Sequence, residues 1–142
     1  MSFPPPLLRI AASPHDAHLL ATFSQDSNII RVLDVRQPGQ ALLELKGHGA
    51  AVNCIEWSSS QRGVLASGGD DCCVMLWDLL NTASGGLPQP SHSAGQSGQV
   101  HGQERGPSAV WDCPYEISNL SWSPVAGSLG VSGGRGLWGV SL

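Results

Sequence analysis

The sequence predicts an all-β protein of about three small antiparallel sheets, each with four strands. Short runs of apolar or alternating side chains are separated by turns rich in Gly, Asp and Ser, which is the pattern of strands. The same order of runs recurs along the 142 residues at a period of roughly 40 to 45 residues, as in a repeat fold. A composition of 41% hydrophobic and 13% charged residues, with 18 Gly and 10 Pro, suits a loop-rich β protein.

The clearest repeat lies in the middle of the chain, at residues 47–78. Residues 52–57 alternate between apolar and polar side chains and predict a half-buried strand. Residues 64–66 and 74–77 are apolar throughout and predict two buried strands, which are joined by a turn that contains two Asp residues. A fourth strand of this unit is expected at 109–113.

The first repeat precedes this unit and has the same three strands. Its segments 8–14, 20–22 and 32–34 align in turn with 53–59, 65–67 and 76–78. A fourth strand is expected at 41–45, after the third strand of this unit.

The last repeat begins at residues 117–124, which match the first strand of the other two units. Residues 131–134 align with 66–69, so that Val131 is expected at the place of Ala66. A third strand is expected at 137–140.

The middle unit opens with a Gly-His pair and closes with a Trp-Asp pair, and in this it resembles a WD repeat, the four-stranded blade of a β-propeller. The resemblance implies one hydrogen-bonded set that pins the blade together, made of His48, Ser67, Asp71 and Trp77. Such a set is needed because buried polar side chains require partners. The expected fold is therefore a partial WD-repeat β-propeller.

The chain is long enough for about three blades, which is fewer than a closed propeller contains. We place the first blade at 1–46, without a preceding Gly-His element, the second at 47–113, and a last, incomplete blade at 114–142. Closed propellers typically have about four to eight blades, so we expect the C-terminal part of a ring of about seven. Two alternatives stay open: a short protein that self-associates, and a truncated fragment with no independent function.

Residues 81–107 interrupt the second blade between its third and fourth strands. They are rich in Gly, Ser, Gln and Pro and contain almost no charge, which predicts a flexible loop. A blade tolerates such an insertion because the entropy cost of closing a loop rises slowly with its length. A passive insertion and a segment for partner binding or modification are both compatible with this composition.

A more specific resemblance comes from the order of several segments. Residues 6–10, 20–22, 32–36 and 52–57 are together similar to the Transparent Testa Glabra subfamily of WD-repeat proteins. This likeness implies a scaffold for kinases or transcription factors. It also implies, as an alternative, a substrate receptor of a cullin–RING ubiquitin ligase.

Three residues are candidates for partner binding. Residues 33–36 resemble the Trp-Asp-x-Arg box through which WD-repeat receptors dock to the damage-binding adaptor of cullin–RING ligases, with Leu in place of the Trp. Arg36 would supply a planar, bidentate donor beside Asp34. A strand end with a surface ion pair is the structural alternative. Arg135 is the third candidate, because its charge replaces the usual Asp of the turn.

The sequence contains no pattern that indicates an enzyme, a cofactor or a metal site. The Ser-Gly-Gly runs at 67–69 and 132–134 lack the Lys and the helix that follow a phosphate loop. The four cysteines include no Cys-x-x-Cys pair and are interpreted as structural thiols. His15 and His18 are expected in a solvated loop.

Charge and hydropathy narrow the class of partner. The net charge is −4, and seven Lys and Arg are scattered along the chain, so direct nucleic-acid binding is not expected. No apolar run approaches the roughly 18 residues of a membrane span, and no signal peptide is recognised, which favours a cytoplasmic or nuclear location. The predicted function is a non-catalytic scaffold or adaptor that binds other proteins.

Overall fold

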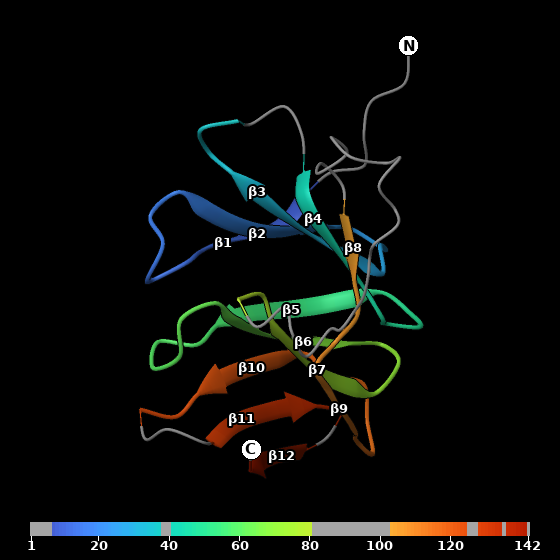
Figure 1. Cartoon of the computed structure of the whole chain (residues 1–142). Coiled ribbons are helices and arrows are strands. Elements are labelled where there is room, and N and C mark those ends of the chain that lie inside the picture. Colours follow the sequence, from blue (N-terminus) through green and yellow to red (C-terminus); the bar gives the residue numbers. More distant parts are fainter. Residues whose placement is uncertain (1–6, 38–40, 81–102, 125–127, 135, 142) are drawn as a thin grey trace.

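The computed structural model describes residues 7–37, 41–80, 103–124, 128–134 and 136–141, and within these ranges every regular element is a strand (Figure 1). In chain order these are β1 (Leu7–Ala12), β2 (Leu19–Ser24), β3 (Ile29–Asp34), β4 (Ala41–Lys46), β5 (Val52–Trp57), β6 (Val64–Gly69), β7 (Cys73–Asp78), β8 (Gln103–Arg105), β9 (Ala109–Asp112), β10 (Asn119–Trp122), β11 (Ser128–Gly133) and β12 (Gly136–Ser141). The predicted all-β fold is confirmed.

The strands form three sheets that are stacked one on the next (Figure 1). The first sheet has the order β1-β2-β3-β4-β8, the second β5-β6-β7-β9 and the third β10-β11-β12. Neighbouring strands run antiparallel except β4 and β8, which are parallel. The fourth strands that we expected for the first and second repeats correspond to β4 and β9.

The hydrophobic core has two parts, one between each pair of neighbouring sheets. Between the first and second sheets, the largest fully buried side chains are Phe23, Ile30, Leu45, Leu65 and Trp77. Between the second and third sheets, the core contains Cys54, Ala66, Val74, Ile117, Leu120, Leu129, Val131 and Val140. The second sheet is therefore covered on both faces, and all six residues of its strand β6 are buried.

Strand β8 corrects part of the prediction that residues 81–107 form a loop. Residues 103–105 pair with residues 43–45 of β4 and become the fifth strand of the first sheet. The Lys46 ammonium donates to the Glu104 carboxylate at 2.6 Å across this pairing. An open strand edge can recruit even a short polar segment, and three polar residues carry no apolar pattern that would have indicated a strand. Residues 81–102 lie outside the described residues.

The third repeat is shifted by one residue from the alignment that its sequence indicated. In the second sheet Trp57 pairs with Leu65, whereas in the third Trp122 pairs with Leu129, so the connection there is one residue shorter. Val131 therefore takes the place of Ser67 and not that of Ala66. Because side chains alternate between the two faces of a strand, this shift exchanges the faces, and Val131 is buried against the second sheet.

Candidate functional site

The polar network of the second sheet lies between its strands β6 and β7 and the turn before β5. The Nε2 atom of His48 is 2.7 Å from the Ser67 hydroxyl, and its Nδ1 atom is 2.9 Å from Oδ2 of Asp71. The Ser67 hydroxyl also accepts a hydrogen bond from Nε1 of Trp77 at 2.8 Å. The structure thus brings together all four residues that the sequence singled out.

The network is complete when the His48 imidazole is neutral. Its Nδ1–H then donates to Asp71, while its Nε2 accepts the Ser67 hydroxyl proton, which leaves the Ser67 oxygen free to accept from Trp77. Burial lowers the pKa of His48, and this effect outweighs the Asp71 carboxylate, which raises it. The neutral ring is therefore the form that the fold stabilises.

Backbone groups hold Asp71 in place. Its Oδ2 accepts the Gly49 N–H at 2.8 Å, and its Oδ1 accepts the Cys73 N–H at 3.2 Å. A side chain at Gly69 would place its Cβ 2.7 Å from the Ala51 carbonyl, so only glycine lets the chain pass this close. The turn geometry thus fixes the Asp71 carboxylate beside the His48 ring.

This arrangement has the residue types of a hydrolytic triad but not its access. Ser67 has no exposed surface, and its hydroxyl is already bonded to two ring nitrogens. A nucleophile must reach its substrate. The set therefore has a structural role in the geometry that is seen here.

Residues 39–78, which hold the whole network, match the family described as WD domain, G-beta repeat. The chain contains a WD40 repeat. The prediction of a partial β-propeller is consistent with this match and with the three stacked sheets.

Several WD-repeat proteins are similar over longer segments. A WD repeat-containing protein of Saccharomyces cerevisiae is 44% identical over 96 residues, which are 68% of this chain and 18% of the yeast protein. A WD repeat-containing protein of Schizosaccharomyces pombe is 31% identical over 160 residues, covering 93% of this chain and 36% of the relative. The DDB1- and CUL4-associated factor 7 homolog of Dictyostelium discoideum is 31% identical over 118 residues, which are 83% of this chain and 31% of the relative. This chain thus spans about a third or less of the length of these relatives.

The other two repeats lack the WD network. Strand pairing places Thr22 of the first repeat and Val131 of the third at the position of Ser67, and Leu33 and Val140 at that of Trp77. The Thr22 hydroxyl instead donates to the Arg9 carbonyl at 2.7 Å. In the third repeat two apolar side chains fill the space of the polar pair.

The candidate pair Asp34 and Arg36 lies at the end of β3. The two side chains form a bidentate ion pair, with Nε to Oδ1 at 2.9 Å and a terminal guanidinium nitrogen to Oδ2 at 2.7 Å. The side chain of Arg36 is 67% exposed, and its hydrogen bonds lower the pKa of the Asp34 carboxyl to about 2. The surface ion pair that we considered as the structural alternative is thus present, and the guanidinium remains accessible. Arg135 lies outside the described residues.

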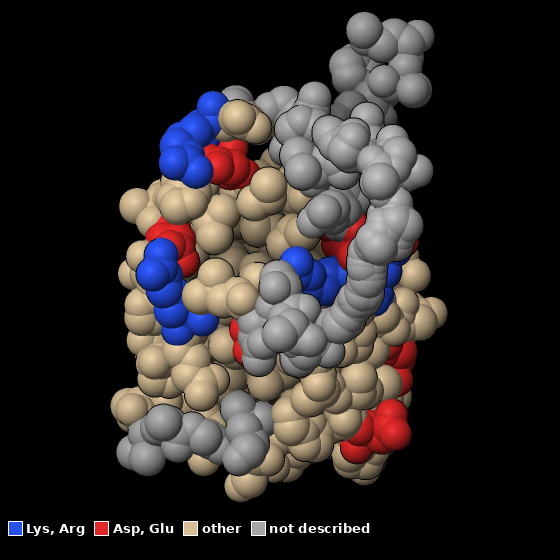
Figure 2. All heavy atoms as spheres, in the orientation of Figure 1, with Lys and Arg blue, Asp and Glu red and all other residues tan. Residues whose placement is uncertain are grey.

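Two further arginine side chains form contacts with distant segments of the chain that the sequence did not indicate. Arg62 pairs with the buried Asp16 carboxylate and lowers its pKa, which joins the second repeat to the first. Arg105 donates to the Leu79 carbonyl at 2.9 Å. On the face that Figure 2 shows, basic and acidic side chains lie next to each other and form no broad patch of one sign. The partners in these two contacts are 46 and 26 residues apart in the sequence, so no local sequence pattern could have predicted them.

The cysteines of the described residues are free thiols. Burial raises the pKa of Cys54 to about 12, and burial together with the Asp112 hydrogen bond raises that of Cys73 to about 11. No group of three or more His, Cys, Asp or Glu that could hold a metal occurs in the described ranges. In the same ranges no helix is long and apolar enough to cross a bilayer.

Proposed function

We propose that this chain is a non-catalytic scaffold or adaptor that assembles protein complexes. WD-repeat proteins generally bind other proteins, and the catalytic-looking residues of the second repeat are sealed inside its blade. The observation that carries the proposal is the Asp34–Arg36 pair, in which Asp34 holds an exposed guanidinium in a fixed orientation. A preorganised arginine is well suited to anchor a protein partner, because less side-chain freedom is lost on binding.

The partner class that we favour is the kinase and transcription-factor group that the Transparent Testa Glabra likeness implies. A substrate receptor of a cullin–RING ligase is the second candidate. It is supported by the similarity to a relative named as a DDB1- and CUL4-associated factor and by the Asp-x-Arg remnant at 34–36. Both roles predict cytoplasmic or nuclear localisation, which imaging of a fluorescently tagged chain would check.

The experiment compares Arg36→Ala with Arg31→Ala in the complete chain. Arg31 lies on β3, which ends two residues before Arg36, and also forms an ion pair, with Glu44 at 3.2 Å, so it is a matched control for the loss of one arginine. Binding of the purified damage-binding adaptor is measured by biolayer interferometry. If the box is used, Arg36→Ala weakens adaptor binding by about tenfold or more, equivalent to about 1.4 kcal/mol, and Arg31→Ala does not.

The outcomes separate the two roles. Unchanged adaptor binding by the Arg36 variant would show that the receptor role through this box is wrong. Lost adaptor binding with intact kinase or transcription-factor binding would show that the two functions use different surfaces. If none of these proteins binds the unmodified chain, the scaffold proposal itself fails for this chain.

A further inference from the structure

Three cysteines lie close together at one end of the second sheet. Cys72 is the last residue of the turn before β7, Cys73 is the first residue of β7, and Cys113 directly follows β9. Cys73 pairs with Asp112, and the Cys113 N–H donates to the Cys72 carbonyl at 2.7 Å. The register of β7 and β9 thus continues for one more residue, so that Cys113 lies opposite Cys72.

The separation of this pair suits a disulfide. Residues that lie opposite each other in an antiparallel pair have Cα atoms about 4.5 to 5.5 Å apart. Disulfides usually join cysteines whose Cα atoms are about 4.4 to 6.8 Å apart. Cys72 and Cys113 are also only half buried, so neither is sealed in the core. A bond between them is therefore compatible with the strand pairing that the structure shows.

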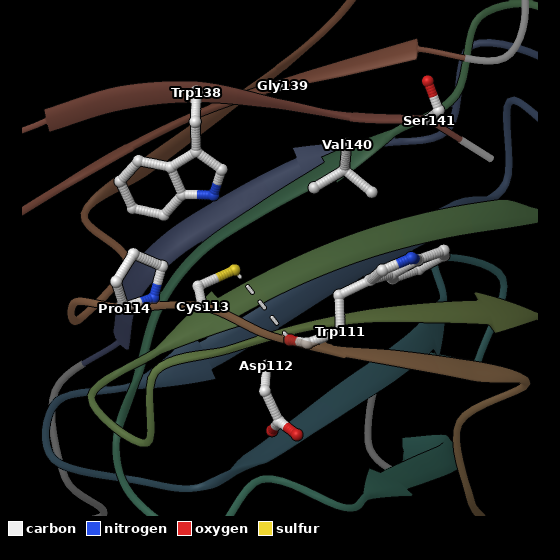
Figure 3. A pocket seen from close by; sticks show the side chains of 8 residues that line it. All are labelled: Trp111, Asp112, Cys113, Pro114, Trp138, Gly139, Val140 and Ser141. Atoms are coloured by element: carbon white, nitrogen blue, oxygen red, sulfur yellow. Dashed lines mark hydrogen bonds between the residues drawn. The ribbon is translucent and has the colours of Figure 1, made fainter.

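Cys73 is less suited to such a bond. Its thiol lies 3.3 Å from a carboxylate oxygen of Asp112, and burial together with this hydrogen bond raises its pKa to about 11. The reactive form of a cysteine is the thiolate, which a raised pKa disfavours. Cys73 packs against the core between the first two sheets, whereas Cys113 packs against the core between the second and third. Figure 3 shows the Asp112 and Cys113 side chains on opposite sides of the chain.

The backbone of Cys72 is in an unusual conformation. Its φ angle is 64°, in the left-handed region that glycine adopts without strain. Among residues with a Cβ atom, Asn, Asp and His are enriched in this region, and cysteine is not. Strain of this kind is often retained where a side chain has a role of its own. The strained backbone is thus a second observation, independent of the distance, that singles out the Cys72 side chain.

We propose that Cys72 and Cys113 form a reversible disulfide when the protein is exposed to hydrogen peroxide. One thiolate of the pair attacks a peroxide oxygen, so that an S–O bond forms, the O–O bond breaks and hydroxide leaves. The other thiolate attacks the resulting sulfenic sulfur, so that the S–S bond forms and the oxygen leaves as water after protonation. In total, two thiols lose two electrons and two protons, and one peroxide becomes two waters.

The bond would fasten β9 to the turn between β6 and β7. Among the described strands, β9 is the outermost of the second sheet and pairs with β7 alone. A disulfide between Cys72 and Cys113 closes a loop of chain that includes residues 81–102, and such a crosslink stabilises the fold by restricting the unfolded chain. A reducing thiol reverses it. This redox site goes beyond the proposed scaffold function and does not involve Asp34 or Arg36.

The test detects the bond directly in the complete chain. The protein is treated with hydrogen peroxide at low concentration of the chain, remaining thiols are blocked with N-ethylmaleimide, and trypsin digestion follows without reduction. Cleavage after Arg62, Arg105 and Arg135 places Cys72 and Cys73 in one peptide and Cys113 in another. We expect mass spectrometry to find these two peptides joined, and dithiothreitol to separate them.

Three variants identify the bonded pair. Cys72→Gly and Cys113→Ser should lose the joined peptides, whereas Cys73→Ser, the matched control at the adjacent cysteine, should keep them. Glycine is chosen at position 72 because it adopts the positive φ without strain. We also expect peroxide to raise the thermal unfolding midpoint of the unmodified chain by about 5 °C or more. Cys113→Ser should show no such rise.

Several results would overturn the proposal. One is an oxidised chain without joined peptides, including a chain that has lost thiols only to sulfinic acid. Another is joining that persists in Cys72→Gly or disappears in Cys73→Ser, because the bonded cysteine would then be a different one. A third is joining between two chains only, seen as a dimer on a non-reducing gel. If circular dichroism shows that Cys113→Ser does not fold, Cys113→Ala replaces it.

Discussion

At the scale of single residues, one serine satisfies two buried rings. Ser67 accepts from the Trp77 indole and is bonded to the His48 imidazole, at 2.8 and 2.7 Å. Both rings are buried in the blade, so neither has water as a substitute partner. The network is therefore sensitive to the loss of its central hydroxyl, because buried groups that lose their partner pay the cost of desolvation.

We expect Ser67→Ala to lower the free energy of unfolding by about 1 to 3 kcal/mol, since it leaves two ring nitrogens without partners. Urea unfolding followed by circular dichroism measures the change. Ser121→Ala, at an exposed serine of β10, is the control and should stay within about 0.5 kcal/mol. Equal effects of the two variants would contradict the role of the network.

The lowered pKa of His48 makes stability depend on pH. The unfolded chain binds a proton on this ring near its ordinary pKa of about 6.5, whereas the folded chain resists protonation until a lower pH. Protonation thus favours the unfolded state, so His48 contributes fully above pH 6.5 and loses its contribution as the pH falls through the folded pKa. We expect the difference in unfolding free energy between the unmodified chain and His48→Gln to shrink from pH 7 to pH 5. A constant difference would show that His48 titrates normally in the fold.

At the scale of elements, neighbouring sheets are joined by the same tryptophan contact. The Trp57 indole donates to the Ala11 carbonyl at 2.9 Å, and the Trp122 indole donates to the Glu56 carbonyl at 3.1 Å. Ala11 and Glu56 are equivalent residues of the first and second repeats by strand pairing. Each contact connects the last residue of the first strand of one sheet to the first strand of the sheet before it. The repeat thus sets the stacking of sheets as well as the strands within them.

A second element-scale feature is the close crossing at the end of β11. A Cβ atom at Gly133 would collide with the Glu116 carbonyl, in the segment that leads into β10. We therefore expect Gly133→Ala to lower the free energy of unfolding by about 1 to 3 kcal/mol through overpacking. Gly106→Ala is the matched control, because its Cβ would meet no atom within 4 Å. Thermal and urea unfolding measure the stability of both variants. A Gly133 variant as stable as the Gly106 variant would be inconsistent with the close crossing.

At the scale of the whole molecule, the stack of three sheets has a covered centre and, among the described residues, exposed apolar side chains at both ends. Ile55 of the second sheet is 2% exposed because it packs against the first sheet, whereas its equivalent Ile10 in the first sheet is 59% exposed. At the other end, Leu137 of the third sheet is 80% exposed. Apolar surface of this kind favours association with another chain.

We expect the isolated chain to self-associate through the outer face of the first sheet. Light scattering should give a mass that rises above the 14.8 kDa of one chain as concentration increases. Ile10→Ser should reduce that mass, while Leu80→Ser, at an exposed leucine outside the sheets, should not. A constant monomer mass at all concentrations would contradict the expectation.

The sequence alone determined the local structure of this protein. Alternating polarity and the spacing of the repeat predicted strands at the positions of β1–β7 and β9–β12, and the WD pattern placed His48, Ser67, Asp71 and Trp77 in one network. These features depend on residues close in sequence or on one repeating unit, which is why a single chain reveals them. Strand β8 left no such pattern, because its three polar residues are strand only through their pairing with β4.

The tertiary structure decided the features that depend on contacts between repeats. The register of the third repeat follows from a connection one residue shorter, and the pairing of Arg62 with Asp16 follows from stacking of the first two sheets. Among the described residues, the third sheet has one strand fewer than the second, and a cavity lined by residues 111–114 and 138–141 lies between β9 and β12 (Figure 3). Local sequence patterns determine which residues form strands. The packing of the sheets determines which faces of those strands are buried, because that depends on contacts between residues far apart in the sequence.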